Sequence, residues 1–96
     1  MSKAVKEYYG KRDENGIKIN QQSQISPGIL QYDMEDKEGI KYIVTDYYDA
    51  AKLKIVETTI WSEEDYCIDE DSETGKLLTN HLEHVTDLYD KGYNNN

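Results

Sequence analysis

The sequence is short of cysteine and of positive charge. Its 96 residues include one cysteine, which excludes a disulfide framework within the chain and a multi-cysteine metal site. Eleven Lys and Arg stand against 20 Asp and Glu, so the formal net charge is -9. A protein that neutralises nucleic-acid phosphates, or that docks on anionic lipid, needs a basic face. We therefore expect no direct binding to nucleic acid or to a membrane.

Long hydrophobic runs are also absent. No apolar stretch approaches the ~20 residues that a membrane-spanning helix needs, and we identify no signal peptide. Together with the single cysteine, these absences predict a cytoplasmic protein. The length suits one small domain, and we identify no internal repeat. We expect a single acidic α+β domain over residues 1–93 and a disordered tail over residues 94–96.

The aromatic residues are unusual in kind. The chain has no Phe, one Trp and nine Tyr, and only 36% of its residues are hydrophobic. Tyr combines a large apolar ring with a hydroxyl that needs a hydrogen bond or water. We expect some Tyr to build the core and others to lie half-exposed, as is typical of a protein interface.

Alternation of apolar and polar residues predicts β-strands over the first two thirds of the chain. Asn15-Gly16 is typical of a tight turn between two strands, and Ser26-Pro27-Gly28 marks a second turn. Residues 45–51 are expected to form a connection or a short turn of helix. The expected strands are 4–11, 16–21, 29–34, 40–45, 53–61 and 66–68.

The apolar spacing changes in the last part of the chain. Apolar residues at i, i+4, i+7 and i+11 predict a helix over residues 76–90, with Ser72 as its N-cap: Leu78, Leu82, Val85 and Tyr89. A competing interpretation makes 73–76 a turn and 77–85 a strand. We prefer the helix, so the predicted fold class is α+β, a small antiparallel β-sheet of four to six strands with one C-terminal helix packed on it.

Acidic residues are concentrated in one segment. Seven carboxylates fall within eleven residues that contain no Lys or Arg: Glu63, Glu64, Asp65, Asp69, Glu70, Asp71 and Glu73. A charge run is usually a solvated surface, but close like charges also repel and cost folding free energy. The alternative hypothesis is a negative surface that meets a basic partner. Tyr66 within this segment could stack on an arginine of that partner.

Two further groups join this candidate partner-binding surface. The second lies at the tip of the hairpin predicted around residue 37, and comprises Asp33, Glu35, Asp36 and Glu38. The third mixes acids and aromatics, and comprises Asp46, Tyr47, Tyr48 and Asp49. Acids on one face of a strand repeat about every 6.6 Å, so a sheet edge and a loop can approximate a row of phosphates at lower density.

Metal and catalytic patterns are weak. Asp69, Asp71 and Glu73 alternate as in a calcium-binding loop, but Thr74 and Asn80 stand where that loop needs Gly and a bidentate acid. We expect His81 to border the core, His84 to be solvated, and Cys67 to be a small buried hydrophobe. No nucleophile motif or phosphate-binding loop is present. We therefore predict no catalytic residues, no metal, no cofactor and no enzymatic activity.

In size and charge the chain resembles the small acidic inhibitors of phages and mobile elements, which include anti-restriction and anti-CRISPR proteins. The resemblance implies a protein that occupies the basic nucleic-acid-binding surface of a partner, such as a nucleic-acid-binding enzyme or a nuclease, by mimicking nucleic acid. One alternative is an immunity or antitoxin protein that plugs the basic active site of a toxin nuclease. Another is a metal-binding or enzymatic domain.

Overall fold

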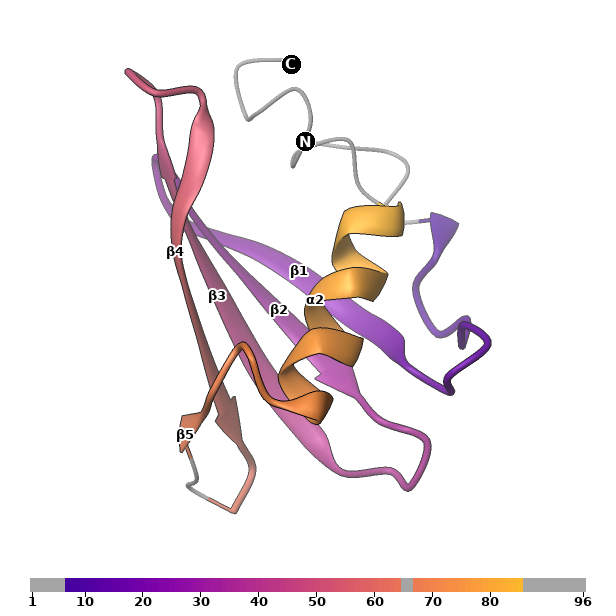
Figure 1. The fold of residues 1–96 in the computed structure, drawn as a ribbon. Helices are drawn as coiled ribbons and strands as arrows, with labels where there is room; N and C mark the ends of the chain where they lie inside the picture. The colour runs from indigo at the N-terminus through magenta and orange to yellow at the C-terminus, as the bar shows by residue number, and fades with distance from the viewer. Residues whose placement is uncertain (1–6, 65–66, 86–96) are drawn as a thin grey trace.

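The computed structural model describes residues 7–64 and 67–85, which form an antiparallel sheet with a helix on one face (Figure 1). The five strands lie in the sheet in chain order, as in a meander. This architecture confirms the predicted α+β fold. The elements are β1 (Lys18–Ser26), β2 (Ile29–Glu35), β3 (Lys41–Asp49), β4 (Lys54–Ser62), β5 (Cys67–Ile68) and α2 (Glu73–Val85).

The core lies between the sheet and α2. Alternate residues of each strand point toward the helix, because successive side chains of a strand face opposite sides. The helix supplies its apolar stripe, in which Leu78 and Leu82 are fully buried. Opposite them lie fully or almost fully buried residues of the strands: Ile19, Leu30, Tyr32, Met34, Val44 and Ile60.

Two turns of the fold share one sequence pattern. Residues 13–18 read Asp-Glu-Asn-Gly-Ile-Lys, and residues 36–41 read Asp-Lys-Glu-Gly-Ile-Lys. In each turn the Asp Oδ1 accepts hydrogen bonds from the backbone N–H groups two and four residues later. Gly16 and Gly39 have φ of 83° and 86°, where L residues with a side chain are strained. The two turns therefore share one local geometry, set by the Asp and the Gly of the pattern.

The two repeated turns pack against each other. Arg12 Nη1 donates to the carbonyl oxygens of Gly16 (2.6 Å) and Asp36 (2.8 Å), and its Nη2 lies 2.9 Å from Glu35 Oε2. A Cβ on Gly16 would overlap the side chain of Lys37 and lie 3.0 Å from its Cα. The hydrogen bonds of Arg12 join the two turns, and Gly16 allows their close approach because it has no side chain.

Three strand predictions need correction. Within the predicted strand 4–11, the described residues make only an isolated bridge, between Tyr9 and Ile19, and residues 4–6 lie outside the described part. β1 extends through the polar residues 21–24, because its alternate positions pair with β2 along its length. Residues 45–49 continue β3 instead of forming a connection, because they pair with β4 across a bulge. The turn at Pro27-Gly28 and the hairpin of β2 and β3 are confirmed.

The helix begins at Glu73, directly after its predicted N-cap and ahead of the range 76–90 in which the apolar spacing indicated it. Ser72 Oγ accepts the backbone N–H of Gly75 at 3.0 Å, so Ser72 is the N-cap that the sequence indicated. The strand alternative for 77–85 is wrong, while Tyr89 and the tail 94–96 lie outside the described residues. Over residues 7–64 and 67–85, no helix has the length and hydrophobicity to cross a membrane.

Candidate functional site

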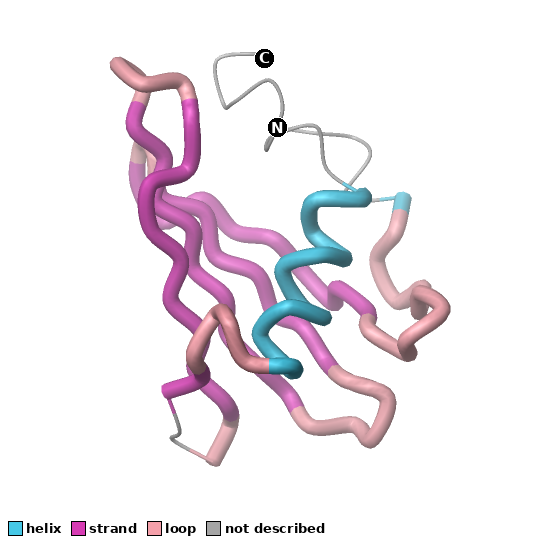
Figure 2. The backbone as a smooth tube through the Cα atoms, in the orientation of Figure 1, coloured by secondary structure: helices cyan, strands magenta, loops and turns pink. Residues whose placement is uncertain are grey.

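The first two acidic groups meet at one end of the sheet. The β2–β3 turn, the β4–β5 turn and the start of α2 all lie at the lower end of Figure 2, while the β3–β4 turn lies at the upper end. Paired hydrogen bonds join two of these segments: Lys41 N–H donates to Glu63 Oε1 (3.0 Å), and Glu63 N–H donates to the Lys41 carbonyl (2.9 Å). We call this region the acidic end and define it by the carboxylates of Asp36, Glu38, Glu63, Glu64, Asp69, Glu70, Asp71 and Glu73.

The buried phenol of Tyr42 is influenced by carboxylates from two of these segments. Tyr42 lies on β3 and donates its hydroxyl proton to Asp36 Oδ2 at 3.0 Å. Burial, this hydrogen bond and the negative charges of Asp36, Glu38 and Glu64 raise the pKa of Tyr42 to about 12. Carboxylates from the β2–β3 turn and from the β4–β5 turn thus act on one hydroxyl group.

The acidic end is not neutralised by nearby bases. Among the described residues, the ion pairs are Arg12 with Glu35 (2.9 Å) and Lys18 with Glu35 (3.8 Å), and His81 lies 3.3 Å from Asp13, a pair that is ionic only when the imidazole is protonated. None of these pairs involves a carboxylate of the acidic end. The lysines of the same segments, Lys37, Lys41 and Lys76, offset three of the eight carboxylates, so the acidic end keeps a surplus of five negative charges.

The carboxylates of the acidic end divide into structural and free groups. Asp36, Glu63 and Asp69 accept hydrogen bonds from backbone N–H groups of their own or neighbouring turns. The other five side chains are exposed and accept no hydrogen bond from any described residue: Glu38, Glu64, Glu70, Asp71 and Glu73. The free group is the part of the acidic end that can meet a partner without loss of internal contacts.

Glu35 has a structural role despite its place in the second acidic group. Hydrogen bonds from Asn20 and Arg12, with the charges of Lys18 and Arg12, hold the pKa of Glu35 below its ordinary value. Its charge is thus already matched inside the molecule. Asp33, two residues earlier on the same face of β2, forms no ion pair with a described residue.

The third predicted group does not join the acidic end. Asp46 is fully buried and accepts a 2.7 Å hydrogen bond from Thr58 Oγ1, so it has no surface to offer a partner. Asp49 Oδ1 accepts the backbone N–H groups of Ala51 and Lys52 and shapes the β3–β4 turn. Tyr47 and Tyr48 are half-buried near that same end. Asp65 and Tyr66 lie outside the described residues.

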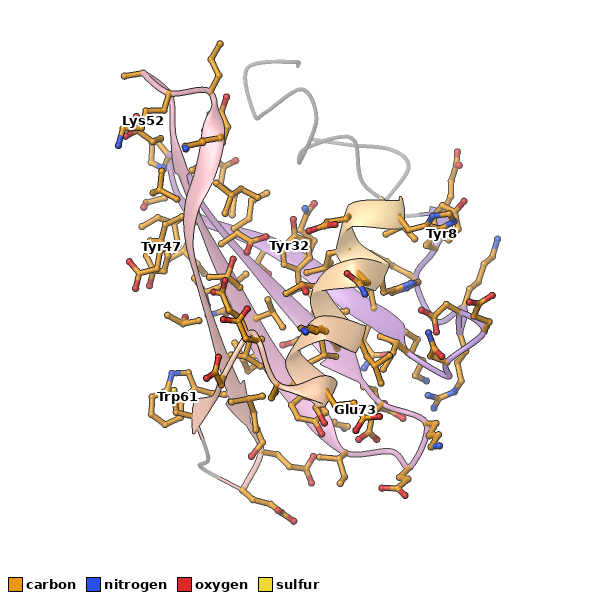
Figure 3. All side chains as sticks on the ribbon, viewed as in Figure 1. Tyr8, Tyr32, Tyr47, Lys52, Trp61 and Glu73 are labelled. Atoms are coloured by element: carbon orange, nitrogen blue, oxygen red, sulfur yellow. The ribbon has the colours of Figure 1, made fainter. Side chains whose placement is uncertain are left out.

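An exposed apolar pair lies on the sheet where the sequence pattern gave no indication of one. Trp61 on β4 is 49% exposed, and Ile43, its partner on β3, is 36% exposed. Cys67, opposite Trp61 on β5, is also exposed, so the expectation that it is buried was wrong. These side chains lie on the face of the sheet opposite α2, which we call the open face. Figure 3 shows Tyr47 and Trp61 projecting on that side, away from the helix.

A histidine lies at the other end of the helix. His81 is buried, as expected, and its Nδ1 lies 3.3 Å from Asp13 Oδ2. Burial lowers the pKa of His81, although the negative charge of Asp13 partly opposes the shift. Within the described ranges, no group of three or more His, Cys, Asp or Glu side chains is placed to hold a metal ion.

Comparison of the chain with protein-family models, with curated protein sequences and with solved structures found no match.

Proposed function

We propose that the protein is a small acidic inhibitor that uses its acidic end to occupy the basic, nucleic-acid-binding surface of a partner protein. The observation that carries this proposal is the convergence of unpaired carboxylates from three separate segments on one end of the sheet. The tertiary structure brings these like charges together, although their mutual repulsion opposes folding. A binding role would balance that cost.

The chemistry of carboxylates suits such a partner. A groove that binds phosphate is lined with Lys and Arg, and Arg takes a carboxylate in two parallel hydrogen bonds, as it takes phosphate. Association led by charge is fast and weakens with salt. The five free carboxylates of the acidic end supply the acceptors for such contacts.

The scaffold fixes the backbone of the β2–β3 turn and of the helix start, which carry some of these groups. The Asp36 carboxylate fixes the β2–β3 turn by accepting the backbone N–H groups of Glu38 and Ile40, and Ser72 caps the helix next to Glu73. Arg12 secures the β2–β3 turn against the neighbouring turn. A rigid set of charges loses less conformational entropy on binding than a flexible acidic tail, so more of the interaction energy appears as affinity.

Charge reversal with a matched control tests the proposal. One triple variant changes a free carboxylate in each converging segment: Glu38→Lys, Glu64→Lys and Glu70→Lys. The control reverses three exposed acids that lie outside the acidic end: Glu7→Lys, Glu14→Lys and Glu83→Lys. Both triples raise the net charge by six, from -9 to -3. Any difference between them therefore depends on position and not on total charge.

The assay has two steps. Immobilised protein captures partners from lysate at low salt, and bound proteins are eluted with duplex DNA, with RNA or with high salt and identified. Each purified partner is then titrated against labelled nucleic acid in the presence of each variant. We expect the wild type and the control triple to displace the nucleic acid, and the acidic-end triple to lose at least roughly tenfold in affinity. Equal behaviour of the two triples would refute the proposal.

A further inference from the structure

The open face presents a continuous row of side chains. The register places Gln21, Asp33, Ile43, Trp61 and Cys67 opposite one another across the five strands. Trp61 and Ile43 stand side by side near the middle of this row. Among the described elements only α2 covers a face of the sheet, and it packs on the other side (Figure 1).

An indole that is half-exposed beside a second exposed apolar side chain is typical of a binding surface. Single surface hydrophobes are common, but Trp61 is one member of a cross-strand pair, with Cys67 exposed on its other flank. Tryptophan is also enriched among the residues that dominate the free energy of protein interfaces. The pair is contiguous with the acidic end, because Glu63 follows Trp61 by two residues on the same strand face.

The charges around this pair decide what can occupy it. Asp33 lies across from Ile43, and Glu57 and Glu63 lie on the Trp61 side of β4. None of these three carboxylates forms an ion pair with a described residue. Lys18 is engaged with Glu35, whereas Lys41, two residues before Ile43 on the same face of β3, offsets one of the three negative charges, so the face keeps a surplus of two. A phosphate backbone, an anionic lipid surface or a second copy of this acidic chain would be repelled.

We propose that Trp61, with Ile43 and the carboxylate of Asp33, receives an arginine side chain from the partner's basic surface. A guanidinium is planar, stacks on an indole and donates paired hydrogen bonds to a carboxylate, and a lysine ammonium combines these properties less well. This inference rests on the proposed function and extends it, because it adds an apolar anchor on the open face to the charges of the acidic end.

Tryptophan fluorescence reports directly on this face, because Trp61 is the one tryptophan of the chain. Wild-type emission is followed during titration with a hepta-arginine peptide and with a hepta-lysine peptide of equal charge. We expect the arginine peptide to change the emission and to bind roughly threefold to tenfold more tightly than the lysine peptide. Identical emission changes and identical affinities for the two peptides would overturn the inference. This fluorescence titration uses only the wild-type protein, so it does not depend on the folding of any variant.

In a second experiment, calorimetry measures the affinities of two variants for the peptides and for the partner. Trp61→Thr keeps a residue that favours strands, and Val56→Thr is the control, since Val56 is also 49% exposed on β4. We expect Trp61→Thr to remove the preference for arginine and to weaken partner binding at least fivefold, and Val56→Thr to change both less than twofold.

The outcomes separate the two proposals. If the acidic-end triple loses the partner while Trp61→Thr keeps it and keeps the arginine preference, the inference is wrong and the proposed function stands. If Trp61→Thr loses the partner while the acidic-end triple keeps it, the charge-led function is wrong. Urea unfolding of each variant shows that a loss of binding is not a loss of fold.

Discussion

The repeated turns allow a steric effect to be separated from a backbone effect. Gly16 and Gly39 occupy the same position of the same turn, with φ of 83° and 86°. Their surroundings differ. A Cβ on Gly16 would overlap Lys37, whereas a Cβ on Gly39 would meet only Glu35 Oε2, at 3.9 Å. Gly16→Ala and Gly39→Ala thus share the cost of the left-handed backbone, but only Gly16→Ala adds the cost of a steric overlap.

The shared cost is the left-handed backbone. An L residue pays about 1–2 kcal/mol there, and we expect Gly39→Ala to lose that amount of unfolding free energy. Gly16→Ala adds an overlap with the backbone and Cβ of Lys37, which cannot be relieved by rotating a flexible side chain. Overpacking of this kind costs about 1–3 kcal/mol more, so Gly16→Ala should lose about 2–5 kcal/mol in total.

Urea unfolding measured by circular dichroism tests this difference. For a domain of this size each kcal/mol also lowers the melting temperature by about 4–8 °C, which gives an independent measurement. Equal losses for the two variants would show that the turns do not press on each other. A larger loss for Gly39→Ala would contradict both the packing of the turns and the role given to Arg12.

Three further predictions concern stability. Gly75→Ala would ordinarily stabilise a helix by about 1 kcal/mol, but here the new Cβ would lie 2.8 Å from Glu70 Cα, and overpacking of about 1–3 kcal/mol should turn this gain into a net loss of up to about 2 kcal/mol in urea unfolding. The folded pKa of His81 is lowered below 6.5, so the unfolded chain binds the proton more readily; unfolding free energy should fall from about pH 7.5 to about pH 6, and fall less in His81→Gln. Asp36→Ala removes three hydrogen-bond acceptances and should cost about 2 kcal/mol, while Glu38→Ala should stay within about 0.5 kcal/mol; similar losses for the pair would refute the structural role of Asp36.

Local signals predicted the parts of the fold that depend on neighbouring residues. The alternation of Leu30, Tyr32 and Met34, and the turn residues Pro27 and Gly28, suffice to place β2 and the turn before it. The first part of β1 was predicted within the strand 16–21, but its polar continuation over residues 22–26 gave no such signal, because that part depends on pairing with β2 rather than on its own composition. The continuation of β3 to Asp49 likewise depends on β4.

The choice of buried face on β4 needed the register. The strand carries apolar residues on both sides, with Ile55 and Trp61 against Val56 and Ile60, so alternation alone does not decide which side is buried. In the sheet, Ile60 pairs with Val44 and is fully buried, which forces Trp61 onto the open face. The exposure of Trp61 could therefore be assigned only once the register between β3 and β4 was known.

A count of acidic residues overstates the charge that a partner can meet. Aspartates that begin turns, such as Asp13, Asp36 and Asp69, use their carboxylates on the backbone of their own loops, as short polar side chains commonly do. The glutamates, with a longer side chain, are the more common members of the free group at the acidic end. The sequence feature that separates the two kinds is the Asp-x-x-Gly pattern of the repeated turns, which assigns Asp13 and Asp36 to structure. Position in a turn, rather than charge alone, thus indicates which carboxylates remain available for recognition.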